Sequence, residues 1–163
     1  MSEENVELAR RAFEAVKRGG FGAASDYVHP EVEFHTYAQA PEAGIYRGKE
    51  AVANYNEHLF GQFENVRFEL EELLDAGDQV VVVHTQHAVP KGGDHEMSVQ
   101  VIEVWTIRDG LLAERHSYGT RQEALEAAGL SEWAMSEENV EVVRQAFEAW
   151  NQGGAESAQA VLG

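Results

Sequence analysis

The sequence has no cysteine, only 3 prolines and few basic residues. Without cysteine the chain can form no disulfide and can do no thiol chemistry, which fits a reducing compartment and leads us to expect a cytoplasmic protein. The 12 Lys and Arg residues face 29 Asp and Glu residues, and the formal net charge of −17 would repel nucleic acids and anionic lipids. The chain also lacks the ~20-residue apolar run of a membrane span and the basic-then-apolar start of a signal peptide. We therefore expect a small molecule or another protein as the partner, and no nucleic acid or membrane.

The residues that are present favour one compact domain with a substantial core, because 44% of the 163 residues are apolar. Apolar spacing predicts helices at 2–20, 21–28, 48–63 and 121–130, and alternation predicts strands at 31–37, 66–74, 79–89, 96–107 and 111–119. Helices first and an antiparallel meander afterwards are typical of an α+β fold. We expect a cone-shaped, curved antiparallel sheet wrapped by N-terminal helices, with an extra C-terminal helix.

The extra helix is expected because the chain repeats its own beginning. Residues 135–154 match residues 1–20 at fourteen of twenty positions, including the Met. We expect 1–134 to form one domain and 135–163 to be the opening helices of a second copy without its sheet. An amphipathic helix of this length is marginal alone in water, so we expect it to dock on an outer surface, most economically by an exchange of tails between two chains. An unstructured tail is the alternative.

Four segments in order, "HPEVEFH", "YRGKEAV", "VWTIRDGLL" and "EALEAAGLSE", resemble a SnoaL-like protein of the nuclear transport factor 2-like superfamily. The resemblance covers residues 1–134. It implies a cone whose sheet and helices enclose a pocket, often in a homodimer. The superfamily includes isomerases, hydro-lyases, cyclases, epoxide hydrolases and non-catalytic binding domains, so the fold does not choose among these functions.

Several positions of this sequence bear on that choice. Phe34 stands at the nearest equivalent of the carboxylate base of related ketosteroid isomerases. Epoxide hydrolases of the superfamily use acidic residues on their late strands, and Ser117 and Thr120 stand where many relatives have acids. Fungal scytalone dehydratase uses a pair of histidines with tyrosines, and the present chain is similar in residue type at His84, His116 and Tyr118.

The turns allow a prediction of strand register, and register decides which side chains meet. A tip at Asp109-Gly110 opposes Glu103 to His116 and Val101 to Tyr118, and a tip at Gly92-Gly93 opposes His84 to Val101. One face then mixes bulky apolar groups with a few polar ones, as a ligand pocket does. The other face is mostly small and β-branched, and an exposed aliphatic surface of that kind would be buried in a homodimer. The aliphatic residues of this second face include Val81, Val83, Ile102 and Val104.

Glu103 and His116 are the sharpest pair in this register. A carboxylate opposite an imidazole can hold one ring nitrogen and leave the other as a base. We therefore expect His116 to abstract a proton, Glu103 to orient it, and His84 and Tyr118 to hold a water or a carbonyl oxygen. A buried polar network that only satisfies itself is the alternative.

The predicted pocket walls would contact the substrate through a further set of side chains. These substrate-binding residues are Trp105, Gln86, Phe34, Tyr55 and Val101. Two histidines and a carboxylate also raise the possibility of a metal, but His84, Glu103 and His116 have no ligand-like spacing. We expect no metal and no cofactor.

These observations favour a small-molecule lyase or isomerase that acts by general acid/base chemistry on a compact, largely apolar cyclic substrate. A non-catalytic binding domain would have the same pocket without turnover. A dimerisation module would instead have a cone filled by side chains.

Overall fold

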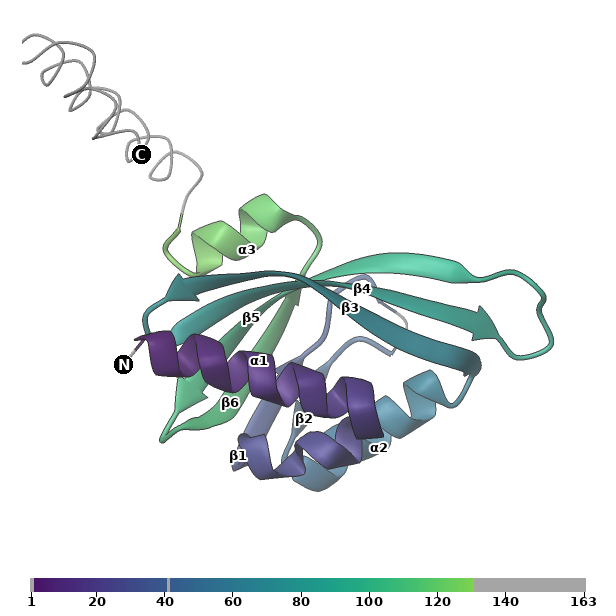
Figure 1. Ribbon diagram of the computed structural model, residues 1–163, viewed down its shortest axis with the longest axis horizontal. Helices are drawn as coiled ribbons and strands as arrows, with labels where there is room; N and C mark the ends of the chain where they lie inside the picture. The colour runs from purple at the N-terminus through teal and green to yellow at the C-terminus, as the bar shows by residue number, and fades with distance from the viewer. Residues whose placement is uncertain (1, 41, 131–163) are drawn as a thin grey trace, which may run out of the picture. The chain divides into compact units, whose positions relative to one another are not determined.

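The computed structural model of the protein describes residues 2–40 and 42–130 (Figure 1). Within these ranges, helix α1 spans Ser2–Gly19, the 3-10 helix η1 spans Phe21–Tyr27, α2 spans Lys49–Phe60 and α3 spans Arg121–Ala127. These elements confirm the four predicted helices. The tail at 135–163, with its predicted extra helix, lies outside the described residues. None of the described helices is long and apolar enough to cross a membrane.

The limits of α1 follow from charge and from glycine. Glu3 and Glu4 lie in its first turn and Lys17 and Arg18 in its last turn, where each sign complements the helix dipole. The next residue, Gly20, has φ 78°, a conformation that glycine adopts without strain, and its N–H donates to the carbonyl of Val16 at 2.9 Å.

The six strands form one curved sheet in the order β2-β1-β6-β5-β4-β3. They are β1 Val28–His35, β2 Ile45–Arg47, β3 Phe63–Ala76, β4 Gln79–Pro90, β5 Met97–Arg108 and β6 Leu111–Tyr118. Strand β1 runs parallel to β6, and all other neighbours are antiparallel. The sequence predicted every strand except β2, which has three residues and is too short to show an alternating pattern.

The predicted register of the last hairpin is correct at the turn and wrong beyond it. Asp109 and Gly110 have φ of 56° and 72° at the tip, and Ile107 pairs with Leu112 as expected. The next pair along the ladder is Thr106 with Glu114, so Ala113 is an extra residue in β6. This bulge shifts every later pair by one residue. The predicted register between β4 and β5, in which His84 pairs with Val101, is confirmed.

Helices cover both faces of the sheet. Helix α1 packs on β3 and β4, α2 packs on β1, and α3 packs on β5 and β6 from the opposite side (Figure 1). We call the face under α1 and α2 the inner face and the face under α3 the outer face. The inner face is the concave side of the predicted cone, and it faces the main core.

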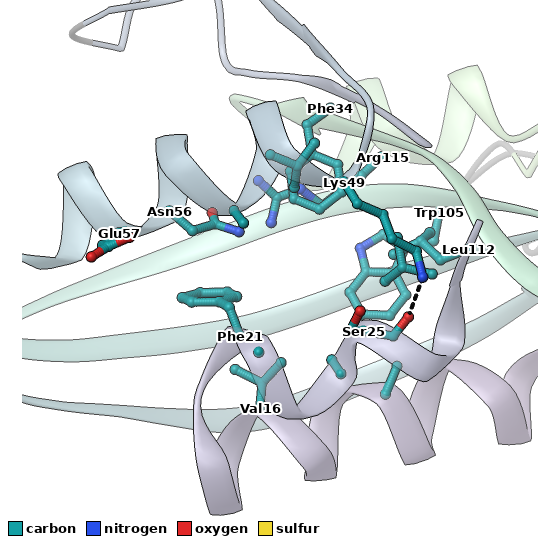
Figure 2. A pocket seen from close by; sticks show the side chains of 16 residues that line it. Val16, Phe21, Ser25, Phe34, Lys49, Asn56, Glu57, Trp105, Leu112 and Arg115 are labelled. Atoms are coloured by element: carbon teal, nitrogen blue, oxygen red, sulfur yellow. Dashed lines mark hydrogen bonds between the residues drawn. The ribbon is translucent and has the colours of Figure 1, made fainter. Parts of the chain in front are cut away.

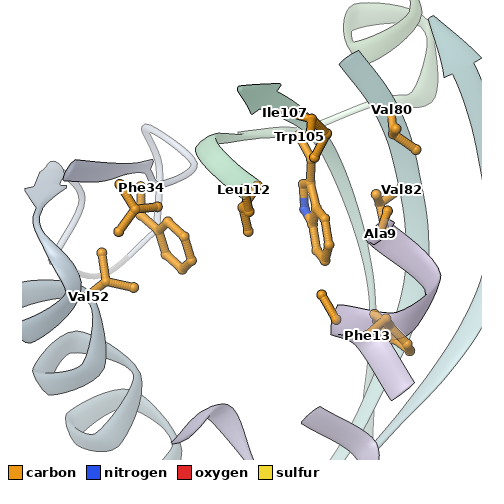
Figure 3. Packing of buried hydrophobic residues seen from close by; sticks show 11 residues of the cluster. Ala9, Phe13, Phe34, Val52, Val80, Val82, Trp105, Ile107 and Leu112 are labelled. Carbon is orange, nitrogen blue, oxygen red and sulfur yellow. The ribbon is translucent and has the colours of Figure 1, made fainter. Parts of the chain in front are cut away.

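The main core fills part of the space between the inner face and the helices (Figure 3). Trp105 and Leu112 stand on the sheet, Phe13 reaches them from α1, and Phe34 and Val52 lie at the other end of the cluster. Phe34, Val52, Leu112 and Trp105 also line the cavity described below.

The outer aliphatic residues are buried within this chain, which corrects the premise of the dimer prediction. Val81, Val83, Ile102 and Val104 have exposed fractions of 0%, 3%, 6% and 2%. Helix α3 packs on this face, and its Leu125 is completely buried. These residues are therefore already shielded from water within one chain. Dimerisation through them stays a prediction, but their burial no longer supports it.

Candidate ligand-binding site

A cavity of about 450 Å³ lies between the inner face of the sheet and the helices (Figure 2). Its walls come from α1, η1, β1, α2, β5 and β6, and most of them are apolar. The polar or charged side chains among the lining residues are Ser25, Lys49, Asn56, Glu57, Trp105 and Arg115. Apolar walls with a few convergent polar groups are typical of a small-molecule site.

Sheet register builds the back wall of the cavity. Phe34 on β1 pairs with Arg115 on β6, and Arg115 pairs with Trp105 on β5, so the three residues form one row across the inner face. The guanidinium carbon of Arg115 lies 3.7 Å from the centre of the Phe34 ring, a cation–π contact. Because the bulge at Ala113 precedes Arg115, it is the bulge that brings this arginine to the inner face.

A buried ion pair holds Arg115 from behind. Arg115 Nε lies 2.9 Å from Glu103 Oε2, and Glu103 is 1% exposed. His84 Nε2 lies 2.9 Å from the other carboxylate oxygen, and Ser117 Oγ donates weakly at 3.4 Å. His84 is itself packed against the Phe13 ring at 5.1 Å between centroids. His84, Glu103 and Arg115 thus form a continuous row of contacts, with Glu103 in the middle.

Glu103 remains ionised in this environment. Burial alone would raise the pKa of its carboxyl group, but the Arg115 charge and the His84 hydrogen bond outweigh burial and lower the pKa to about 2. A carboxylate with so low a pKa is a poor proton acceptor at neutral pH. We therefore assign Glu103 to positioning Arg115 rather than to accepting a proton.

The side-chain amide of Asn56 and the terminal amino groups of Arg115 have no hydrogen-bond partner among the described residues. Asn56 on α2 is 3% exposed, and its side-chain amide makes no hydrogen bond to any of them. The two terminal amino groups of Arg115 are likewise without a hydrogen bond in the described part of the chain. Figure 2 shows both side chains reaching toward the cavity. Because Asn56 lines the cavity, a ligand oxygen placed there would accept a hydrogen bond from its amide.

Other polar groups define the edges of the cavity. Lys49 Nζ donates to the carbonyl of Ser25 at 2.9 Å, which joins α2 to η1 at one side. Glu57 is exposed and is the only carboxylate among the lining residues of the described chain. The buried indole nitrogen of Trp105 makes no hydrogen bond within the described residues, although it lies near the Glu103 carboxylate.

Of the predicted substrate-binding residues, Trp105 and Phe34 line the cavity. Val101 and Gln86 lie on the inner face but beyond the cavity lining. Tyr55 is buried on α2 and stacks on the Tyr46 ring at 4.3 Å, and it does not line the cavity either.

The predicted contact between Glu103 and His116 is wrong. Glu103 pairs with Ser117 and His116 pairs with Val104, so the two side chains stand on opposite faces of the sheet. Tyr118 pairs with Ile102 and also lies on the outer face. Burial, and then the adjacent His35 ring, lower the pKa of His116, while burial raises the pKa of Tyr118. Neither group reaches the cavity, so the mechanism that joined them to Glu103 and His84 cannot operate inside it.

Sequence reasoning missed Arg115 and Asn56. The tripeptide "ERH" of β6 carried the signal, since its middle residue must lie opposite to its outer two. Only knowledge of the bulge would have shown which of the two sets faces inward. Asn56 had a weaker signal, an amide one residue beyond the apolar Tyr55 on a predicted helix.

Comparisons with known proteins agree with this architecture. The family model described as a SnoaL-like domain matches residues 9–115, which is more than half of the chain. None of the curated proteins matches the sequence significantly.

Three solved structures illustrate the likeness in fold. Bal32a, from a soil-derived mobile gene cassette, has a TM-score of 0.64 at 21% identity, over 72% of this chain and 89% of that chain. A Mesorhizobium loti protein described as a SnoaL-like polyketide cyclase has a TM-score of 0.59 at 24% identity, over 69% and 96%. TerC, co-crystallised with polyporic acid, has a TM-score of 0.62 at 20% identity, over 77% and 98%. At these identities the likeness shows the fold alone.

Proposed function

The chain belongs to the SnoaL-like domain family, and we propose that it binds a compact, largely apolar cyclic molecule in the inner-face cavity and acts on it as a lyase or isomerase. The observation that carries the proposal is that the amide of Asn56 and the terminal amino groups of Arg115 have no hydrogen-bond partner in the described chain and face a largely apolar cavity. A protein that used this space only for packing would have little reason to leave them unpaired.

The donors define the chemistry of the ligand. An amide N–H and a guanidinium both donate, so the complementary group is an oxygen acceptor such as a carbonyl, an enol or a phenol. Glu103 neutralises the charge of Arg115, so the ligand need not be a strong anion. The apolar lining, including Phe34 and Val52, would contact the carbon skeleton.

The same donors supply a catalytic effect if the ligand oxygen gains negative charge during reaction. Arg115, which forms an ion pair with Glu103 and a cation–π contact with the Phe34 ring, would stabilise an enolate that forms when a proton leaves the neighbouring carbon. Glu57 is the lining carboxylate that could accept that proton. TerC, which has the same fold, was co-crystallised with polyporic acid.

A second candidate function is non-catalytic binding of the same class of molecule. The exposure of Glu57 at the cavity edge favours it, because water hydrates an exposed carboxylate and makes it less available to a substrate carbon. The two candidates share the anchoring role of Arg115 and Asn56 and differ only in turnover.

The bicyclic ketone α-tetralone can test both candidates. Calorimetric titration measures its binding, and proton NMR in D₂O measures exchange of the protons next to its carbonyl. We expect Asn56→Leu to weaken binding at least tenfold, as for loss of a charge-free buried hydrogen bond of about 1.4 kcal/mol. Glu57→Gln should keep binding and lose exchange.

The matched control is Asn54→Leu, because Asn54 is exposed on the same helix. Equal affinity of the wild type and Asn56→Leu would overturn the anchoring role. Binding without accelerated exchange in the wild type would leave the non-catalytic function as the answer.

A further inference from the structure

Two tripeptides of the pattern Glu-x-His lie side by side on neighbouring strands. Residues 33–35 on β1 read "EFH", and residues 114–116 on β6 read "ERH". The two strands run parallel and in register, with Glu33 beside Glu114 and His35 beside His116. Phe34 and Arg115 point into the cavity, so these four side chains gather on the outer face.

The cluster is compact. The His35 and His116 rings stack at 3.8 Å between centroids with 13° between their planes. One ligand atom from each of His35, Glu114 and His116 can be chosen so that all lie within 4.8 Å of one another. Ligands of a tetrahedral zinc ion are about 3.3 Å apart, given bonds of about 2.0–2.1 Å, so small side-chain rotations bring the three to a common ion.

Without a cation the arrangement is unfavourable. Like charges directly opposite on neighbouring strands destabilise a sheet, and Glu33 and Glu114 form such a pair. Arg47 Nε lies 3.5 Å from Glu33 Oε1, but no basic side chain of the described residues forms an ion pair with Glu114. The buried Nε2 of His35 lies 3.3 Å from Glu33 without a hydrogen bond. An unpaired carboxylate and an unsatisfied imidazole nitrogen thus lie together.

We propose that His35, Glu114 and His116 form a site for a divalent transition-metal ion, with Zn²⁺ the ion that best matches the ligands. Two imidazoles and one carboxylate are a ligand set that zinc accepts, with a water in the remaining position. The cluster is half-buried, which leaves room for that water. Glu33, next to His35, would orient that ring from outside the coordination sphere.

The reason that sequence reasoning expected no metal is now visible. It placed His116 on the inner face with Glu103 and His84, where no ligand spacing existed. The bulge at Ala113 instead places His116 beside His35. The ion would link β1 to β6 on the outer face, opposite Phe34 and Arg115. It would thereby stabilise the part of the sheet that forms the back wall of the cavity.

Equilibrium dialysis of the full chain against ZnCl₂, followed by mass spectrometry of the metal, tests the proposal. We expect one zinc per chain in the wild type. His35→Gln and His116→Gln should each weaken binding at least tenfold. The control is His95→Gln, since the His95 side chain is 93% exposed and remote from the cluster in the fold, and it should bind zinc as the wild type does. Wild type that retains no zinc, or histidine variants that retain it unchanged, would overturn the site.

Glu114→Gln gives a second, independent readout through thermal unfolding. Without zinc this variant should melt at or above the temperature of the wild type, because it removes one of two opposed carboxylates. With zinc the order should reverse, because the ion stabilises only the folded chain that binds it. The same order of melting temperatures with and without zinc would contradict the proposal, and it would do so even if a histidine variant failed to fold.

Discussion

The two faces of β6 carry different sets of functional side chains, although both sets come from the same short stretch of sequence. On the inner face, Arg115 joins Glu103 and Phe34 and faces a cavity. On the outer face, Glu114 and His116 join the matching residues of β1. The inner set is electrically paired and its donors lack only a ligand, whereas the outer set contains an opposed pair of carboxylates. The difference teaches that one inserted residue, Ala113, decides which chemistry each face receives.

The largest effect should come from breaking the inner ion pair. Arg115→Met leaves the buried Glu103 carboxylate without its cationic partner, and we expect the free energy of unfolding to fall by about 3–5 kcal/mol. Urea denaturation followed by circular dichroism measures the loss. The matched control is Arg47→Met, whose exposed arginine contacts Glu33 on the other face and should cost less than about 1 kcal/mol. Similar losses in both variants would mean that the buried ion pair contributes no more to stability than the exposed one.

A smaller effect, of a few kcal/mol, should appear as a dependence on pH. The pKa of Glu103 is about 2 in the folded chain against 4.5 for an ordinary glutamate, so the unfolded chain binds its proton first as the solution is acidified. The stabilisation is therefore complete above about pH 4.5 and is lost as the pH falls toward 2. Unfolding free energies of wild type and Glu103→Gln, measured across this range, should converge at the acid end. Parallel profiles would show that Glu103 is not the group responsible.

Asn56 should show a still smaller effect, and one of the opposite sign. The Asn56 residue is 3% exposed and its amide has no hydrogen-bond partner in the described chain, so Asn56→Leu adds apolar surface to the cavity wall and should raise the free energy of unfolding by about 1 kcal/mol while it weakens ligand binding. A gain in stability together with a loss of affinity is typical of a residue kept for function. Asn54→Leu, on the exposed side of the same helix, should change neither quantity appreciably. Destabilisation by Asn56→Leu would instead assign the amide a structural role.

The same comparison shows which features of the fold could be predicted from the sequence and which could not. The helices and the long strands were predictable because their patterns are local: the apolar stripe of α1, the alternation of β4 and β5, and the Asp109-Gly110 turn. The parallel pairing of β1 with β6 joins residues far apart in the chain, so no local pattern indicates it. The bulge was also hidden, because Ala113 is as compatible with a regular strand as with an irregular one. The correct inner residues Glu103, His84, Trp105 and Phe34 were found, but Arg115 was exchanged for its neighbour His116.

The smallest effect should come from the outer face, where the sequence had predicted a catalytic hydroxyl. Tyr118 pairs with Ile102 on that face, and no hydrogen bond joins its side chain to another described residue. Tyr118→Phe removes only the hydroxyl, so the free energy of unfolding should change by less than about 0.5 kcal/mol. The affinity for α-tetralone should stay the same, because the side chain does not line the cavity. Titration of the variant beside the wild type measures this directly. A tenfold loss of affinity would place the hydroxyl at the ligand. It would contradict the register that puts Tyr118 on the outer face and Arg115 on the inner face.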